Sequence, residues 1–237
     1  MAPELAVPDP ADSADPSGPA DSADPSGPAD SADDPYRISE LGALERLYGA
    51  PAAAALAKEV AYLHPHYRAF IEAAPLLVLA TSGPGGLDVS PRGDRAGWVA
   101  LEDEQTLLLP DRRGNNRIDS LRNIVADPRV ALLFLVPGVG ETLRVNGRAA
   151  ISVAPALLAR FAVDGKAPRS VLVIKVEAVF FQCARALVRA KLWDEGSRRA
   201  RAELPSAGAM LAALSAGAID GGRYDLELPE RLANSLY

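Results

Sequence analysis

The residues best suited to chemistry lie in the segment LLLPDRRGNNRIDSLRNI, at positions 107–124. In this segment an apolar strand pattern is followed by basic and amide residues, and then by an amphipathic helical pattern over 117–126. The first turn of a helix exposes unpaired N–H groups and a partial positive charge, which attract anions. Arg117, with Arg112 or Arg113, adds donors whose geometry suits a phosphate. The segment therefore predicts a site for an anionic group.

The same segment also has a purely structural interpretation. Asn115 or Asn116 could cap the helix with its side-chain oxygen. The arginines could then form ion pairs with Asp111 and Asp119. The residues alone leave both interpretations open.

Other candidate motifs in the chain are weaker. His64 and His66 have no nearby carboxylate or thiol, so turn residues at a helix junction explain them better than metal ligands. Gly83, Gly85 and Gly86 suggest part of a dinucleotide fingerprint, but a strand pattern follows where that fingerprint requires a helix, so we predict turn glycines. The sequence contains no GxSxG, HExxH or P-loop motif, and we predict no metal site and assign no catalytic residue.

The composition limits the possible functions. A hydrophobic fraction of 49% supports a sizeable core in 237 residues, and a net charge of −6 argues against nucleic-acid binding. No apolar run has the roughly 20 residues of a membrane span, and no signal-peptide pattern is present. Cys183 is the only cysteine, and we predict that it is a small buried apolar residue. We therefore expect a cytoplasmic protein with neither membrane nor nucleic-acid partners.

The sequence predicts four segments. The nonapeptide PADSADPSG occurs twice in succession near the N-terminus and offers nothing apolar to bury. We therefore predict that 1–35 is a disordered acidic tail. N-terminal helices are expected over 36–66, the main domain over 67–195, and a C-terminal helix and tail over 196–237.

Strand patterns dominate the main domain. Seven short patterns with turn signals between them indicate an antiparallel barrel or sandwich rather than a parallel sheet. They are LLVLATS (76–82), LDVSPRG (87–93), GWVAL (97–101), TLLLP (106–110), RVALLFLV (129–136), TLRVNGRAAIS (142–152) and SVLVIKVEAVFF (170–181). Helical patterns are expected at 38–48, 51–63, 66–74, 117–126, 154–161 and 204–214, and a polar tail at 221–232.

Two blocks of the sequence, in order, resemble a known family. FIEAAPLLVLATSGPGGLDVSPRGD is followed by LLLPDRRGNNRIDSLRNIVADPRVALLFLVPGVGETLRVNGRA. Together they resemble the pyridoxamine 5'-phosphate oxidase-like, FMN-binding split-barrel family, in particular its bacterial flavin-nucleotide-binding branch. The resemblance covers about residues 65–195. It implies a mainly β fold with flanking helices. The expected architecture is a six-stranded antiparallel Greek-key split β-barrel, which forms an FMN-binding domain over 67–195.

Carried over by position, the resemblance also implies how the cofactor is held. The FMN phosphate would contact Asn116, Arg117 and Ser120, helped by Arg92, while Arg112 and Arg113 would lie on the solvated side of the turn. The ribityl chain and ring would lie along two strand segments, whose residues are Val89, Ser90, Pro91, Arg92, Leu108, Leu109, Pro110 and Asp111.

The family is usually homodimeric, with FMN at the subunit interface. The resemblance therefore implies that Thr142 and Arg144 approach the flavin from the partner subunit, and that Arg189 and Trp193 line the substrate pocket. It implies an oxidoreductase that moves a hydride between FMN and a small substrate. The alternatives are a deazaflavin-dependent reductase with the same groove, or a non-catalytic flavin-binding or sensing protein.

Overall fold

The computed structural model describes residues 36–237, so the tail predicted over 1–35 lies outside the described residues. The chain divides into two compact units after Ala50. In the first unit the structure describes one helix, α1 (Leu41–Tyr48), none of whose residues is buried. The helix was expected from residue 38, but Glu40 is still extended, with φ −115° and ψ 132°, so α1 begins three residues later.

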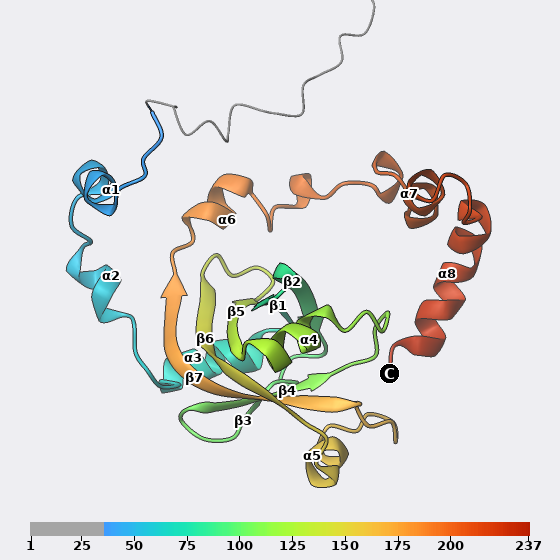
Figure 1. Ribbon diagram of the computed structural model, residues 1–237, viewed down its shortest axis with the longest axis horizontal. Helices are drawn as coiled ribbons and strands as arrows, with labels where there is room; N and C mark the ends of the chain where they lie inside the picture. The colour runs from blue at the N-terminus through green and yellow to red at the C-terminus, as the bar shows by residue number, and fades with distance from the viewer. Residues whose placement is uncertain (1–35) are drawn as a thin grey trace, which may run out of the picture. The chain divides into compact units, whose positions relative to one another are not determined.

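The second unit is built around one antiparallel sheet, which Figure 1 shows strongly curled. Its strand order is β2-β1-β5-β6-β7-β4-β3. Strands β5, β6 and β7 form a meander, and β4 pairs with β7. Because β4 precedes this meander in the chain, reaches β5 through the long connection 112–128 and yet lies beside β7, the four strands form a Greek key. The strands are β1 (Leu76–Gly83), β2 (Gly86–Gly93), β3 (Ala100–Leu101), β4 (Thr106–Asp111), β5 (Arg129–Leu135), β6 (Thr142–Ser152) and β7 (Ser170–Gln182).

The predicted mainly β, Greek-key split-barrel fold is confirmed, and each of the seven strand patterns forms a strand. The exception in length is β3, which keeps only two of the five residues expected. Gly97 before it has φ +84°, and the Trp98 indole donates a hydrogen bond to the Ala74 carbonyl. This turn delays the strand, so six longer strands carry the sheet.

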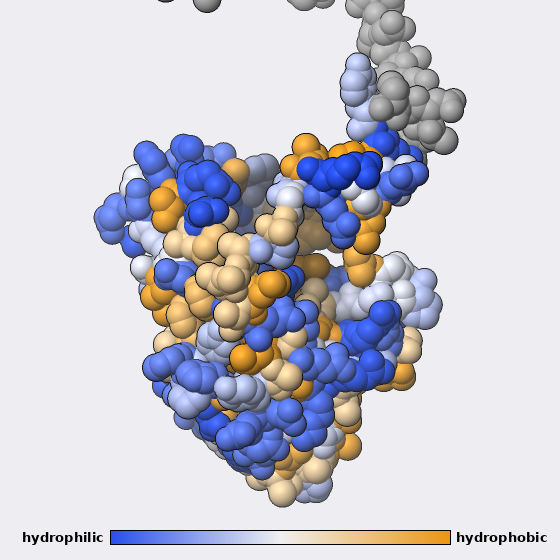
Figure 2. Space-filling view, turned by 90° about the vertical axis from the view of Figure 1, so that its left-hand side faces the viewer, coloured by the Kyte–Doolittle hydropathy of each residue, from blue (hydrophilic) through white to orange (hydrophobic). Residues whose placement is uncertain are grey.

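Alternating side chains of these strands fill the core. Phe134, Leu79 and Leu143 are fully buried on three neighbouring strands, as the period-two pattern predicts. Burying each such side chain stabilises the fold by about 1.5–3 kcal/mol. Apolar residues also remain on the surface, where Figure 2 shows them in orange among hydrophilic ones.

Short helices flank the sheet. Helix α3 (Pro65–Ala73) packs against β6 and β7, and α5 (Pro155–Arg160) packs against β7. Helix α4 (Asp119–Ala126) contacts β1, β2 and β6. It approaches β1 closely at Gly83, where a Cβ atom would lie 2.2 Å from the Asn123 side-chain oxygen. Gly83 therefore permits helix packing, while Gly86, with φ +102°, makes the predicted turn.

The helix predicted over 51–63 is wrong for most of its length. Helix α2 covers only Ala53–Ala57. Val60 then exchanges main-chain hydrogen bonds with Val179 of β7, in an isolated bridge. Pairing with the sheet therefore replaces the last helical turns that the apolar spacing suggested.

The C-terminal segment is also more helical than predicted. After α6 (Arg185–Ala190) and two short 3₁₀ turns, α7 (Ala207–Leu214) forms where a helix was expected. The polar tail predicted over 221–232 is wrong, because α8 (Gly221–Ser235) occupies it. Asp220 caps α8 by accepting a hydrogen bond from the Arg223 N–H. Among the described residues, no helix is both long and apolar enough to cross a membrane.

Candidate functional site

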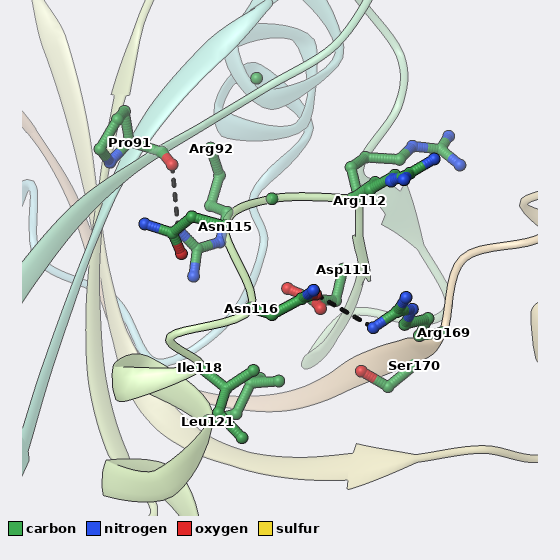
Figure 3. Close-up of a pocket in the computed structure, with 13 residues that line it drawn as sticks. Pro91, Arg92, Asp111, Arg112, Asn115, Asn116, Ile118, Leu121, Arg169 and Ser170 are labelled. Carbon is green, nitrogen blue, oxygen red and sulfur yellow. Dashed lines mark hydrogen bonds between the residues drawn. The ribbon is translucent and has the colours of Figure 1, made fainter. Parts of the chain in front are cut away.

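A cavity of about 330 Å³ lies where β2, the β4–α4 connection and the start of β7 meet. Figure 3 shows side chains from all three segments around it. Four residues that the sequence assigned to the cofactor line it: Pro91, Arg92, Asp111 and Asn116. The rest of its lining consists of Gly93, Arg112, Arg113, Gly114, Asn115, Ile118, Leu121, Arg169 and Ser170.

Arg92 is held in place at this cavity by two hydroxyl groups. Its guanidinium Nη1 donates to the Ser90 Oγ at 2.8 Å and to the Pro91 carbonyl at 3.0 Å, a bond drawn in Figure 3. Its Nη2 donates to the Ser120 Oγ at 3.2 Å. A planar guanidinium fixed in this way keeps its remaining donors oriented for a bidentate anion.

Ser120 links this arginine to helix α4. It is 4% exposed, and its hydroxyl donates to the Asp88 carboxylate at 2.7 Å. The Ser90 and Ser120 oxygens lie 3.0 Å apart, so Ser90 can donate to Ser120 while it accepts from Arg92. In this arrangement the only proton of Ser120 is used by Asp88. Ser120 therefore positions Arg92 and has no free donor for a ligand.

The start of α4 differs from the predicted cap. Ile118 is the N-cap residue, in the left-handed region at φ 54°, and it makes no side-chain capping bond. The Asn115 side-chain oxygen accepts a hydrogen bond from the N–H of Arg117, which lies before the first residue of α4. Asn116 also has a positive φ of 60°. The amide residues therefore shape the turn before the helix, and the predicted cap by Asn115 or Asn116 is wrong.

Two arginines of the segment have different partners. Arg117 has a side chain that is 75% exposed and forms an ion pair with Asp119 at 2.8 Å, as the structural interpretation proposed. Arg112 is not on the solvated side of the turn, which corrects the prediction. Its Nε donates to Asp94 at 2.7 Å and its Nη1 to the Phe161 carbonyl at 2.7 Å. An arginine bound on two sides has no freedom to extend into solvent.

Asp111 places a half-buried carboxyl in the cavity. Burial raises its pKa, and the charges of Arg92 and Arg169 lower it in part. Desolvation penalises the charged form of a carboxyl, whereas neighbouring cations favour it. Ionisation of this carboxyl is therefore costly in the folded protein, and the carboxylate is suited to accept hydrogen bonds from hydroxyl groups.

Asp111→Asn is expected to stabilise the cofactor-free protein at pH 7. A carboxyl whose pKa is raised on folding stabilises the fold below its unfolded pKa, and this contribution is lost as the pH rises through the folded pKa. The variant should therefore unfold at a higher urea concentration at pH 7, and the advantage should shrink towards pH 4.

Asp127→Asn provides a control of opposite sign. Hydrogen bonds from Arg129 lower the pKa of Asp127 to about 2. That stability is present above the unfolded pKa and is lost as the pH falls through about 2, so this variant should be less stable at pH 7. Equal urea midpoints for wild type and Asp111→Asn from pH 4 to 7 would contradict the role given to Asp111.

The other residues assigned to the ribityl chain and ring lie apart from the cavity. Val89 is 65% exposed on β2, and Ser90 acts through Arg92. Leu108 and Leu109 are buried in apolar clusters, and Pro110 is buried next to them. Leu109 could therefore contact a ligand only through its main chain.

Thr142 and Arg144 lie on β6, outside the lining of this cavity. Thr142 is buried. Arg144 and Asn146 line a separate cavity of about 530 Å³. The Arg144 Nε and Asn146 Oδ1 atoms are buried, and neither has a hydrogen-bond partner within residues 36–237. The Arg144 guanidinium also lies over the Phe180 ring, 4.4 Å from its centroid. One protomer therefore does not bring these residues to the site of Arg92.

The two residues assigned to a substrate pocket are also separate. Arg189 is exposed in the last turn of α6. The Trp193 indole donates to the Val139 carbonyl at 2.7 Å, which ties the end of α6 to the β5–β6 loop. Cys183, before α6, is exposed, so its predicted burial is wrong. Neither Arg189 nor Trp193 lines the cavity around Arg92.

Arg169 is a charged residue of the cavity lining that the sequence did not predict. Its Nη1 donates to the Asn116 side-chain oxygen at 3.0 Å across the cavity, as Figure 3 shows. Asp111 of β4 pairs with Ser170 of β7, which places Arg169 beside the segment. A pairing across 59 positions leaves no local pattern, so only the strand register could have identified it.

The two histidines lie at the N-terminus of α3, at a helix junction as predicted, and His66 belongs to the first turn of the helix. His64 is the N-cap of α3, and its Nδ1 accepts a hydrogen bond from the His66 N–H. Within residues 36–237, no group of three His, Cys, Asp or Glu side chains could hold a metal ion.

Comparison with known proteins gives a family match. The family model described as pyridoxamine 5'-phosphate oxidase matches residues 63–183, which are 121 of the 237 residues. The chain has no significant match among curated proteins.

Solved structures resemble the chain over about half its length. They include HupZ from Group A Streptococcus, with 18% identity, 51% of this chain and 94% of that chain covered, and a TM-score of 0.42. General Stress Protein 26 from Bacillus anthracis has 17% identity, with 48% and 88% covered and a TM-score of 0.37. A protein named as FAD-binding from Mesorhizobium loti has 18% identity, with 51% and 94% covered and a TM-score of 0.35.

Proposed function

The chain belongs to the pyridoxamine 5'-phosphate oxidase family, and on that premise we propose that it is an FMN-binding oxidoreductase. The FMN phosphate lies in the cavity beside Arg92. The observation that supports this proposal most directly is the orientation of Arg92 by the Ser90 and Ser120 hydroxyls. A charged donor fixed in advance binds an anion without a further loss of side-chain entropy.

The residues around the cavity fit a phosphate. Arg92 and Arg169 are cations on opposite sides of it, and the Asn115 and Asn116 amides lie between them in sequence and in the cavity lining. The main chain from Gly114 to Ile118 leaves N–H groups near the first turn of α4, where anions are favoured. Arg117 could join only by giving up its ion pair with Asp119.

The residues next to the phosphate fit a polyhydroxyl chain. Asp111 lines the same cavity, and an ionised carboxylate accepts hydrogen bonds from hydroxyl groups. The flavin supplies the hydride chemistry when it is bound, while the protein binds and orients it. We assign no general acid or base, because the only carboxyl in the cavity lining is Asp111, which serves binding.

The proposal includes a homodimer. Arg144 Nε and Asn146 Oδ1 are buried polar atoms without partners among the residues that the structure describes, and such atoms are costly unless a ligand or another chain satisfies them. Exposed apolar side chains on the sheet, among them Leu76, Val89 and Phe181, would lose contact with water in an interface. In the dimer, β6 of one protomer approaches the flavin of its partner, and Arg189 and Trp193 border the substrate.

Two alternatives use the same cavity. A deazaflavin with a phosphate on its side chain would need the same cations. A flavin-binding protein without catalytic activity would need no substrate pocket at all, which fits the absence of an assigned acid or base.

Native mass spectrometry of protein purified without added cofactor tests the proposal. The expected species is a dimer of 24.9 kDa chains with two bound flavins, and denaturation should release FMN. Release of a deazaflavin would show that the first alternative is correct and that the cofactor is not FMN. Colourless protein that binds neither added FMN nor a deazaflavin would refute flavin binding.

A second measurement separates an enzyme from a sensor. Under anaerobic conditions, a reduced nicotinamide should reduce the bound flavin and bleach its colour. An added electron acceptor should then reoxidise the flavin and restore the colour. A flavin that stays oxidised with NADH and with NADPH would favour the non-catalytic alternative.

A further inference from the structure

A second cavity, of about 320 Å³, lies next to the first. It is lined by Arg112, Arg113, Lys166 and Arg169, together with Ala167, Pro168 and Tyr237. Arg112, Arg113 and Arg169 also line the first cavity. The two cavities are therefore adjacent, with three arginines along their common border.

The lining of the second cavity carries positive charge that the fold neutralises only in part. It contains four cationic side chains and no acidic one. In the part of the chain that the structure describes, the side chains of Arg113 and Lys166 have no hydrogen-bond or ion-pair partner. Arg169 donates a hydrogen bond to the neutral Asn116 amide, and the Asp111 carboxyl of the first cavity offsets part of its charge. Like charges brought together in this way repel each other unless an anion joins them.

One side of the second cavity is fixed. Asp94 accepts hydrogen bonds from the Arg112 Nε and from the Tyr237 hydroxyl, both at 2.7 Å. The Arg112 guanidinium also lies 5.4 Å from the centre of the Tyr237 ring. Asp94 thus neutralises Arg112 alone and holds it still, while Arg113 and Lys166 keep their charge for a ligand.

We propose that the second cavity binds a second phosphate group next to the one in the first cavity. The shared chemistry is a phosphoryl group, since guanidinium groups bind phosphate oxygens in a bidentate manner. It belongs either to an extended flavin, such as the pyrophosphate of FAD, or to a separate phosphorylated substrate bound beside FMN. The inference rests on the proposed function, because it places the flavin phosphate in the first cavity.

Calorimetric titration at low salt tests the inference with two variants. The test variant combines Arg113→Ala and Lys166→Ala. Both side chains are exposed, and neither forms a hydrogen bond or ion pair with a residue that the structure describes. The matched control combines Arg46→Ala and Arg68→Ala, which remove the same charge outside both cavities and break no ion pair among the described residues. FMN, FAD and inorganic pyrophosphate are the three probes, and pyrophosphate is titrated into protein with and without FMN.

Either of two results supports a second phosphate site. FAD binds wild type about tenfold more tightly than FMN does, and the test variant loses this difference while the control keeps it. Alternatively, FAD and FMN bind equally, but pyrophosphate binds the FMN-loaded wild type about tenfold more tightly than the test variant. The first result assigns the phosphate to the cofactor, and the second assigns it to a separate ligand.

The failures are distinguishable. If FMN binds, but FAD has no advantage and pyrophosphate binds wild type and test variant equally, the second phosphate site is wrong and the flavin site stands. If no flavin binds while pyrophosphate binds the flavin-free wild type better than the test variant, the proposed function is wrong and the phosphate site stands.

Discussion

Arg92→Ala is expected to weaken FMN binding by about 100-fold, which corresponds to roughly 3 kcal/mol. Arg92 is the one cation of the cavity whose guanidinium is oriented by two hydroxyls, at 2.8 and 3.2 Å. Hydrogen bonds to a charged group contribute about 1.5–3 kcal/mol, and loss of a bidentate donor lies at the top of that range. Quenching of flavin fluorescence on binding gives the dissociation constants.

Two variants separate the charge of Arg92 from its orientation. Arg92→Lys keeps the charge without the planar donor pair, so it should recover only part of the affinity. Ser120→Ala removes one of the hydroxyls that position Arg92 and should weaken binding by about tenfold. Wild-type affinity in Arg92→Ala, at unchanged folding stability, would place the phosphate elsewhere.

Local patterns were sufficient for the strands of this fold. Phe134 and Leu143 alternate with more exposed neighbours, and this period-two signal survives in the structure because the same alternation buries one face of the sheet. Helix ends were predicted less well. Val60 fits the helical spacing but pairs with Val179 in the structure, and local sequence spacing cannot predict this long-range contact.

Helix α8 was missed because its sequence contains residues that disfavour helices. Gly221, Gly222 and Pro229 each lower helix propensity. The structure shows what compensates for them: the Asp220 cap, an ion pair between Arg223 and Glu227, and close packing on α7. A Cβ atom on Gly221 would lie 2.3 Å from the Gly208 carbonyl oxygen, so the glycine that weakens the helix permits the packing.

Site residues that lie within the two family-like sequence blocks were predictable. Asn116 and Arg92 follow from the two sequence blocks, and both line the cavity. Arg112 was misplaced because its partner, Asp94, lies 18 residues earlier and reaches it only through the fold. Arg169 reaches the site because Asp111 of β4 pairs with Ser170 of β7, and this register cannot be derived from the sequence. Contacts between distant segments are thus the part that needed the structure.

Gly147→Ala is expected to destabilise the protein by about 3 kcal/mol, the upper part of the range for overpacking a core. Gly147 is buried in β6, where the pairing with β7 shifts register between Asn146 and Gly147. A Cβ atom there would lie 2.2 Å from the Lys175 carbonyl oxygen and 3.1 Å from its carbonyl carbon. Main-chain atoms of a paired strand cannot move aside as a flexible side chain would. Urea unfolding followed by far-UV circular dichroism gives the difference in free energy.

Gly85→Ala is the matched control, because the same methyl group added there meets no atom within 4 Å. Gly85 does not have a positive φ, so alanine can take its conformation and should change stability by no more than about 0.5 kcal/mol. The register shift at Gly147 also determines the side of the sheet on which the Arg144 and Asn146 side chains lie. Gly147→Ala should therefore weaken flavin binding as well, if β6 of one protomer serves the site of its partner. An unfolding midpoint equal to that of Gly85→Ala would show that β7 yields at Lys175, and the close approach would then have no energetic consequence.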